Sequence, residues 1–73
     1  MDKRTFAIDG ELDAISYEWL LQNAANLLRA VEQDVAKGYT AQVIRQRVIE
    51  RTGRLELAQR CEQAARHVAG LGV

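Results

Sequence analysis

Large apolar side chains recur at helical spacing over residues 12–37, the longest such pattern in the chain. One stripe consists of Tyr17, Leu20, Ala24, Leu27 and Val31, and a second stripe beside it consists of Leu21, Ala25, Leu28 and Val35. Because two adjacent stripes make a wide apolar face, this helix needs more than one neighbour. The pattern predicts a first helix over 12–37 that forms the centre of a bundle, completed within the chain or by a second copy.

Local signals mark the end of this helix and the start of the next. Lys37 lies in the last predicted turn, and Gly38 follows where a left-handed residue is favoured. Thr40 is a good N-cap for a second helix that begins at Ala41. Since only Gly38 and Tyr39 lie between them, the two helices are expected to be antiparallel neighbours.

Gly53 interrupts the second helical pattern and leaves two arrangements open. The stripe keeps its phase across the glycine, which favours a helix over 41–69, with apolar positions at Ile44, Val48, Ala58, Cys61 and Ala65. Alternatively, Thr52 caps a separate third helix. We therefore predict an all-α fold, an antiparallel helical hairpin with its second helix kinked or broken at Gly53. A three-helix bundle is the close alternative.

The ends of the chain are expected to lie outside this domain. Residues 4–9 alternate weakly between apolar and polar, and Asp9-Gly10 is typical of a turn. No second strand-like segment is present to pair with them. The sequence therefore predicts a short extended arm over 1–11, a single helical domain over 12–69 and a tail over 70–73.

The small size of the chain limits how it can be stabilised. A chain of 73 residues buries only about 60% of the surface that it exposes when unfolded. Cys61 is the only cysteine and His67 the only histidine, so an internal disulfide is excluded and a structural zinc site is not expected. We expect no cofactor and no metal, and self-association as the source of added stability.

Charge is balanced overall but unevenly distributed. Residues 1–36 carry seven acidic and three basic side chains, whereas residues 37–73 carry seven basic and three acidic ones. An acidic helix packed beside a basic one explains this division. No apolar run is long enough to span a membrane, and no apolar leader follows the charged start. We expect a cytoplasmic protein.

Cys61 and His67 are the pair to test as a nucleophile and its base. They lie six residues apart on one helix, so a rotation of about 240° around the helix axis separates them and they face different sides. Cys61 also lies on the apolar stripe, where a buried structural thiol is expected. The sequence therefore argues against an enzyme.

The wide apolar face of the first helix predicts a protein–protein interaction module: an adaptor, a chaperone-like protein or an oligomerisation domain. Its partner would be a second copy or another protein. Tryptophan is enriched at interface hot spots, although Trp19 could equally form the edge of the core. The candidate partner-binding residues are Trp19, Leu21, Leu28 and Val35.

The alternative is a small nucleic-acid-binding or regulatory protein. Its candidate residues share one helix edge at spacings of four and three, namely Arg47, Arg51 and Arg54. Such side chains could contact phosphates or bases. Against this, the sequence pI of about 6.6 is far from the basic footprint of a nucleic-acid-binding domain.

Overall fold

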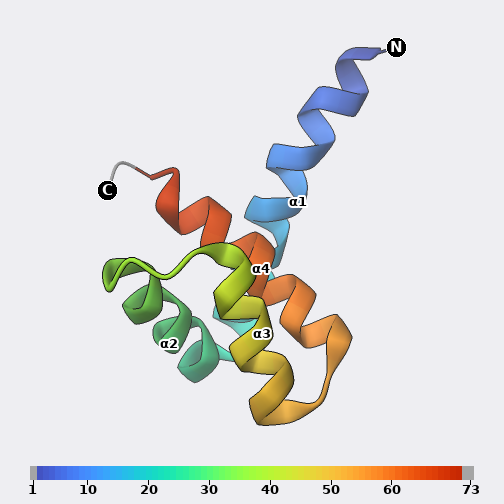
Figure 1. Ribbon diagram of the computed structural model, residues 1–73. Coiled ribbons are helices and arrows are strands. Elements are labelled where there is room, and N and C mark those ends of the chain that lie inside the picture. The colour runs from blue at the N-terminus through green and yellow to red at the C-terminus, as the bar shows by residue number, and fades with distance from the viewer. Residues whose placement is uncertain (1, 72–73) are drawn as a thin grey trace.

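The computed structural model describes residues 2–71, and the side chains of residues 11–71. This part of the chain forms four helices and no strand: α1 Asp2–Asn23, α2 Ala25–Ala36, α3 Ala41–Thr52 and α4 Leu55–Ala69 (Figure 1). The all-α prediction is confirmed. Neither the predicted hairpin nor the three-helix bundle is confirmed, because each of the two long helical patterns is divided into two helices.

The last described helix, α4, is the centre of the molecule, since it packs against all three other helices and makes the most extensive contacts, with α1 and α3 (Figure 1). Its buried side chains are small, which lets the other helices approach closely: Ala58, Cys61, Ala64 and Ala65. Larger side chains from the other three helices complete the core: Leu20, Leu28, Val31, Ile44 and Val48. The expectation that residues 12–37 form the centre is therefore wrong.

Ala24 separates α1 from α2, where one continuous helix over 12–37 was predicted. Its backbone leaves the helical region, with φ −151° and ψ 57°. The Asn23 side-chain amide donates to the Trp19 carbonyl oxygen at 2.9 Å. The Ala24 N–H donates to the Leu20 carbonyl at 2.7 Å, which satisfies one of the acceptors that the end of a helix leaves open. The break lets Leu20 of α1 and Leu28 of α2 both enter the core. Neither glycine nor proline marks this position in the sequence.

The predicted extended arm over 1–11 is also wrong, because residues 2–11 belong to α1. Asp9-Gly10, expected as a turn, lies inside that helix. A glycine within a helix costs about 1 kcal/mol relative to alanine, which weakens the helix without ending it. At the other end, Gly70 and Leu71 form a turn after α4, and the rest of the predicted tail lies outside the described residues.

The turn between α2 and α3 agrees with the sequence. Gly38 has φ 95° and its N–H donates to the Val35 carbonyl, while the Tyr39 N–H donates to the Asp34 carbonyl. This pair of bonds is the Schellman motif. The Thr40 hydroxyl accepts a hydrogen bond from the Val43 N–H at 3.2 Å, so its predicted role as N-cap of α3 is confirmed.

Gly53 breaks the second helical pattern rather than bending it. It has φ 71° and ψ 11°, and its N–H donates to the Ile49 carbonyl at 2.7 Å. The Thr52 hydroxyl donates to the Val48 carbonyl and accepts from the Arg54 N–H. Of the two predicted possibilities at Gly53, a kink and a break, the kink is not confirmed and the break is observed, because α3 ends and α4 turns back to pack against it.

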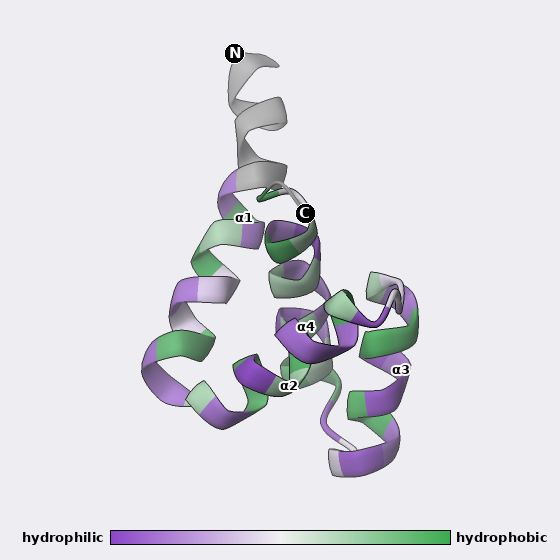
Figure 2. Ribbon diagram, turned by 90° about the vertical axis from the view of Figure 1, so that its left-hand side faces the viewer, coloured by the Kyte–Doolittle hydropathy of each residue, from purple (hydrophilic) through white to green (hydrophobic). Residues whose placement is uncertain are grey.

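Three contacts show that α1 and α4 run antiparallel. The Arg66 guanidinium lies 3.5 Å from the Asp13 carboxylate. Further along α1, the Ser16 hydroxyl donates to Gln63, and the Arg60 guanidinium lies 4.4 Å from the centre of the Trp19 ring. As residue numbers rise on α1 they fall on α4. Figure 2 shows hydrophobic residues, in green, on the ribbons of α1, α3 and α4.

Candidate functional site

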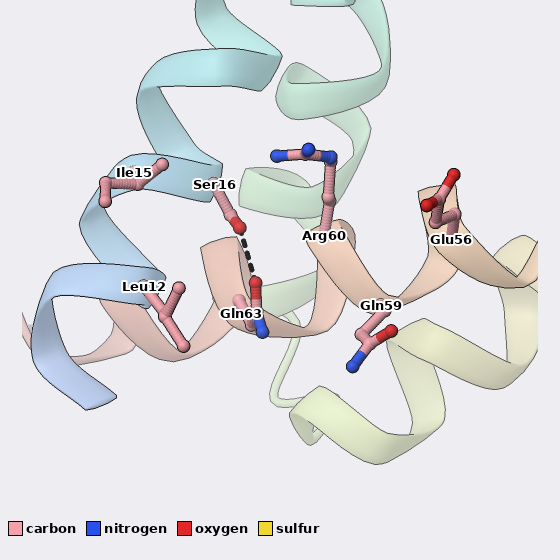
Figure 3. A pocket seen from close by; sticks show the side chains of 7 residues that line it. All are labelled: Leu12, Ile15, Ser16, Glu56, Gln59, Arg60 and Gln63. Atoms are coloured by element: carbon pink, nitrogen blue, oxygen red, sulfur yellow. Dashed lines mark hydrogen bonds between the residues drawn. The ribbon is translucent and has the colours of Figure 1, made fainter. Parts of the chain in front are cut away.

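A shallow groove runs between α1 and α4 and has a volume of about 290 Å³. It is lined by three residues of α1 and four of α4: Leu12, Ile15, Ser16, Glu56, Gln59, Arg60 and Gln63 (Figure 3). The wall on α1 carries the aliphatic side chains, and the wall on α4 is polar and charged. We take this groove as the candidate site because apolar and hydrogen-bonding groups meet along it.

The aliphatic wall consists of Leu12 and Ile15, which are 42% and 55% exposed. They lie on the side of α1 that turns away from the core. Ser16 and Leu20, on the inner side of the same helix, are 2% and 0% exposed. A helix turns about 100° per residue, so one residue of separation is enough to move a side chain from core to surface.

A hydrogen bond forms the floor of the groove. The buried Ser16 hydroxyl donates to Gln63 Oε1 (Figure 3). A buried hydroxyl without a partner would be costly, and the Gln63 side chain satisfies it. Gln63 uses its acceptor in this bond, so its amide NH₂ keeps donors for a group that enters the groove.

Arg60 is the cation of the groove. Its guanidinium lies over the Trp19 ring, an arrangement in which the ring face attracts positive charge. Within the described part of the chain, no carboxylate lies within 4.0 Å of it, although Arg45, Arg47 and Arg66 each have such a partner. Arg60 is therefore a partly buried charge that no acidic side chain of this part of the chain neutralises.

The predicted partner-binding residues do not share one surface. Leu28 is buried in the core and Val35 packs against it. Leu21 is 49% exposed, and Trp19 packs at the edge of the core beneath Arg60. The helix break at Ala24 explains the separation, because it turns the α2 half of the predicted face toward α4.

Leu12 and Ile15 were not identified as candidate residues from the sequence. The expectation that a helix begins near residue 12 placed them at a helix end. Their spacing of three, followed by four to Trp19, is a helical pattern in its own right. From the sequence, this spacing could have identified Leu12 and Ile15 as part of an apolar helix face.

The arginine edge is only partly present. Arg47 Nε lies 3.4 Å from Asp34 Oδ2, and its guanidinium lies 4.9 Å from the centre of the Tyr39 ring. Arg51 and Arg54 are exposed. Since Arg47 already has an acidic partner, the nucleic-acid alternative keeps two of its three arginines at the surface and stays an untested prediction.

The thiol of Cys61 is buried, as the sequence predicted. Burial raises its pKa from 9.0 to about 11, because the apolar surroundings disfavour the thiolate. The thiol form therefore dominates at neutral pH, and it is a poor nucleophile. His67 packs its ring 4.9 Å from that of Tyr17. No cluster of three or more His, Cys, Asp or Glu side chains within residues 11–71 is arranged to hold a metal ion.

The described residues fold into four helices, and the groove between α1 and α4 combines aliphatic side chains with the Arg60 guanidinium. No protein-family model, curated protein or solved structure matches the chain. None of the helices in residues 2–71 combines the length and the apolar character that a membrane crossing needs.

Proposed function

We propose that this protein is a small, non-enzymatic interaction module that binds another protein surface through the outer face of α1. We define this outer face by Leu12, Ile15 and Trp19. The observation that carries the proposal is the exposure of Leu12 and Ile15 along the groove between α1 and α4. Covering the exposed parts of two aliphatic side chains would contribute roughly 1 kcal/mol each to binding.

The proposal moves the binding surface away from the one that the sequence suggested. Leu28 and Val35 pack within the chain, so they are poor candidates for a partner contact. Leu12 and Ile15 lie next to groups that confer specificity, namely the Gln63 amide and the Arg60 guanidinium. A small apolar centre with polar groups at its border is typical of protein interfaces. A cytoplasmic location is part of this proposal.

Site-specific photo-crosslinking in cells tests this proposal. A photoreactive amino acid replaces Ile15 in one variant and the exposed Gln33 of α2 in a matched control. We expect crosslinks from position 15 and few from position 33. Leu12→Asp should remove the crosslinks from position 15 without changing the circular dichroism spectrum. Equal crosslinking from both positions, or none from position 15, would show that the outer face of α1 is not a binding surface.

A further inference from the structure

We infer that the partner of the outer face of α1 is a second copy of this chain, with the two α1 helices parallel and related by a two-fold axis. In this pair, Glu18 of one copy lies against Arg60 of the other. The inference rests on the proposed function, because it names the partner of the same surface.

The spacing along α1 supplies the contact line. Leu12, Ile15 and Trp19 are separated by three and then four residues, the spacing of a helix pair with a seven-residue repeat. In the sequence, the same spacing continues back to Ile8, and α1 begins before that position, at Asp2. The helix is therefore long enough to extend the contact beyond the groove.

Opposite charges flank this line. On one side lie the exposed acids Glu11 and Glu18, each immediately before a residue of the line. On the other side lie Ser16 and, reaching across from α4, the Arg60 guanidinium over Trp19. Neither Glu18 nor Arg60 has an oppositely charged partner within 4.0 Å among the described side chains. The surface thus carries both members of an ion pair that one chain does not form.

The order of these flanks selects the orientation of the two helices. In a parallel two-fold pair, each flank of one helix faces the opposite flank of its partner, so Glu18 meets Arg60 twice. In an antiparallel two-fold pair, like flanks face each other, and the acids of one copy would meet the acids of the other. Charge complementarity therefore favours the parallel pair, which also places the two helical bodies on opposite sides of the contact.

The small contact sets the expected strength. A stable interface buries about 1,200–2,000 Å² in total, and a line of three side chains with one repeated ion pair covers less than that. Self-association should therefore be weak, rapid and dependent on concentration. It should also weaken as salt is added, because the ion pair lies at the border of the contact.

A charge exchange measured by sedimentation equilibrium tests the inference. The unmodified protein should shift from monomer to dimer as its concentration rises from micromolar to millimolar. Glu18→Arg alone and Arg60→Glu alone should each weaken dimerisation at least tenfold, and the double variant should restore it. Arg51→Glu, at an exposed site on α3, is the control that should leave dimerisation unchanged. Glu18 is exposed, so its variant tests the contact even if Arg60→Glu disturbs Trp19.

Disulfide formation reports the orientation. In a Cys61→Ala background, Leu12→Cys should oxidise to a disulfide-linked dimer, because a parallel pair brings the same position of both copies together. Gln33→Cys should not. An antiparallel pair centred on Ile15 would instead place position 12 opposite position 19 and give no such disulfide. A protein that is monomeric throughout the concentration range, or a double charge exchange that fails to restore dimerisation, would overturn the inference. If such a monomer still gave crosslinks from position 15 to a different protein, the proposed interaction function would stand and only the second copy would be wrong.

Discussion

Gly53 shows how one residue redirects the chain. Its left-handed backbone, with φ 71°, ends α3 and leaves only Gly53 and Arg54 before α4. No atom lies within 4 Å of the place that a side chain at Gly53 would occupy. Any effect of adding a methyl group there must therefore come from the backbone and not from crowding.

We predict that Gly53→Ala destabilises the protein. A left-handed conformation costs an alanine roughly 1–2 kcal/mol, and the lost freedom of the unfolded chain offsets about 0.4–1 kcal/mol of this. The net loss should be about 1 kcal/mol, which lowers the melting temperature by about 4–8 °C in a domain of this size. Thermal unfolding followed by circular dichroism measures it.

Gly70→Ala is the matched control for that substitution. Gly70 has φ −80°, a right-handed value that alanine adopts readily. The melting temperature of the Gly70→Ala variant should stay within about one or two degrees of that of the unmodified protein, or rise slightly. An equal loss in both variants would mean that the left-handed conformation at Gly53 is not what separates α3 from α4.

At the scale of the elements, ion pairs between helices add to the contacts made by the core. Asp34 of α2 pairs with Arg47 of α3, and Arg45 of α3 pairs with Glu62 of α4. Arg47 Nε is itself buried and makes no hydrogen bond among the described residues, so its contact with Asp34 is one of charge. The Asp34–Arg47 pair joins an acid of the first half of the chain to a base of the second half, as the division of charge in the sequence suggested.

We predict that Arg47→Gln and Arg51→Gln differ in their effect on stability. The first removes the contacts of Arg47 with Asp34 and the Tyr39 ring, each worth about 0.5 kcal/mol at a site that is partly open to solvent. Its free energy of unfolding should fall by about 1 kcal/mol in urea denaturation. Arg51→Gln should change it by less than about 0.5 kcal/mol.

A double-mutant cycle identifies the cause. In an Asp34→Asn background, Arg47→Gln should cost about half as much, because only the contact with Tyr39 is left to lose. If Arg47→Gln left stability unchanged, the arginine would be available for a phosphate. All three arginines of the nucleic-acid alternative, Arg47, Arg51 and Arg54, would then be available for binding.

Several elements could be predicted from the sequence because their signals are local. Gly38 favours the left-handed backbone that ends a helix, and the Thr40 hydroxyl can cap the start of the next one. Both residues act as expected. The break at Ala24 has no such signal, since it is favoured by the burial of Leu20 and Leu28 on α4. Tertiary packing decides such positions, and periodicity within one segment does not report it.

The candidate site was harder to predict for the same reason. The two apolar stripes do lie on helices. The spacing of apolar residues does not show, however, whether another part of the same chain will bury them. Leu28 is covered by the chain and Leu21 is not. The groove depends on α4 lying beside α1, a pairing between the first and last helices that no local pattern contains.

At the scale of the whole molecule, the core is small. Among the described side chains, small residues of α4 fill much of the core, and five large aliphatic side chains are buried in it: Leu20, Leu28, Val31, Ile44 and Val48. Each of these therefore carries a large share of the stability of the fold.

We predict a large difference between neighbouring leucines. Leu20→Ala should lower the free energy of unfolding by about 2–5 kcal/mol, because Leu20 is 0% exposed at the contact of α1 with the core. Leu21→Ala, at a residue that is 49% exposed, should change it by less than about 0.5 kcal/mol. Denaturation in urea measures both. Similar losses in the two variants would contradict the packing of α1 described above.

The central place of α4 also bears on the order of events during synthesis. A ribosome completes α1, α2 and α3 before it reaches the helix against which all three pack. Until then, the leucine, isoleucine and valine side chains of the core have no α4 surface to cover them. The residues of α1, α2 and α3 that pack on α4 are therefore uncovered when they emerge, and this fold is complete only once α4 has left the exit tunnel.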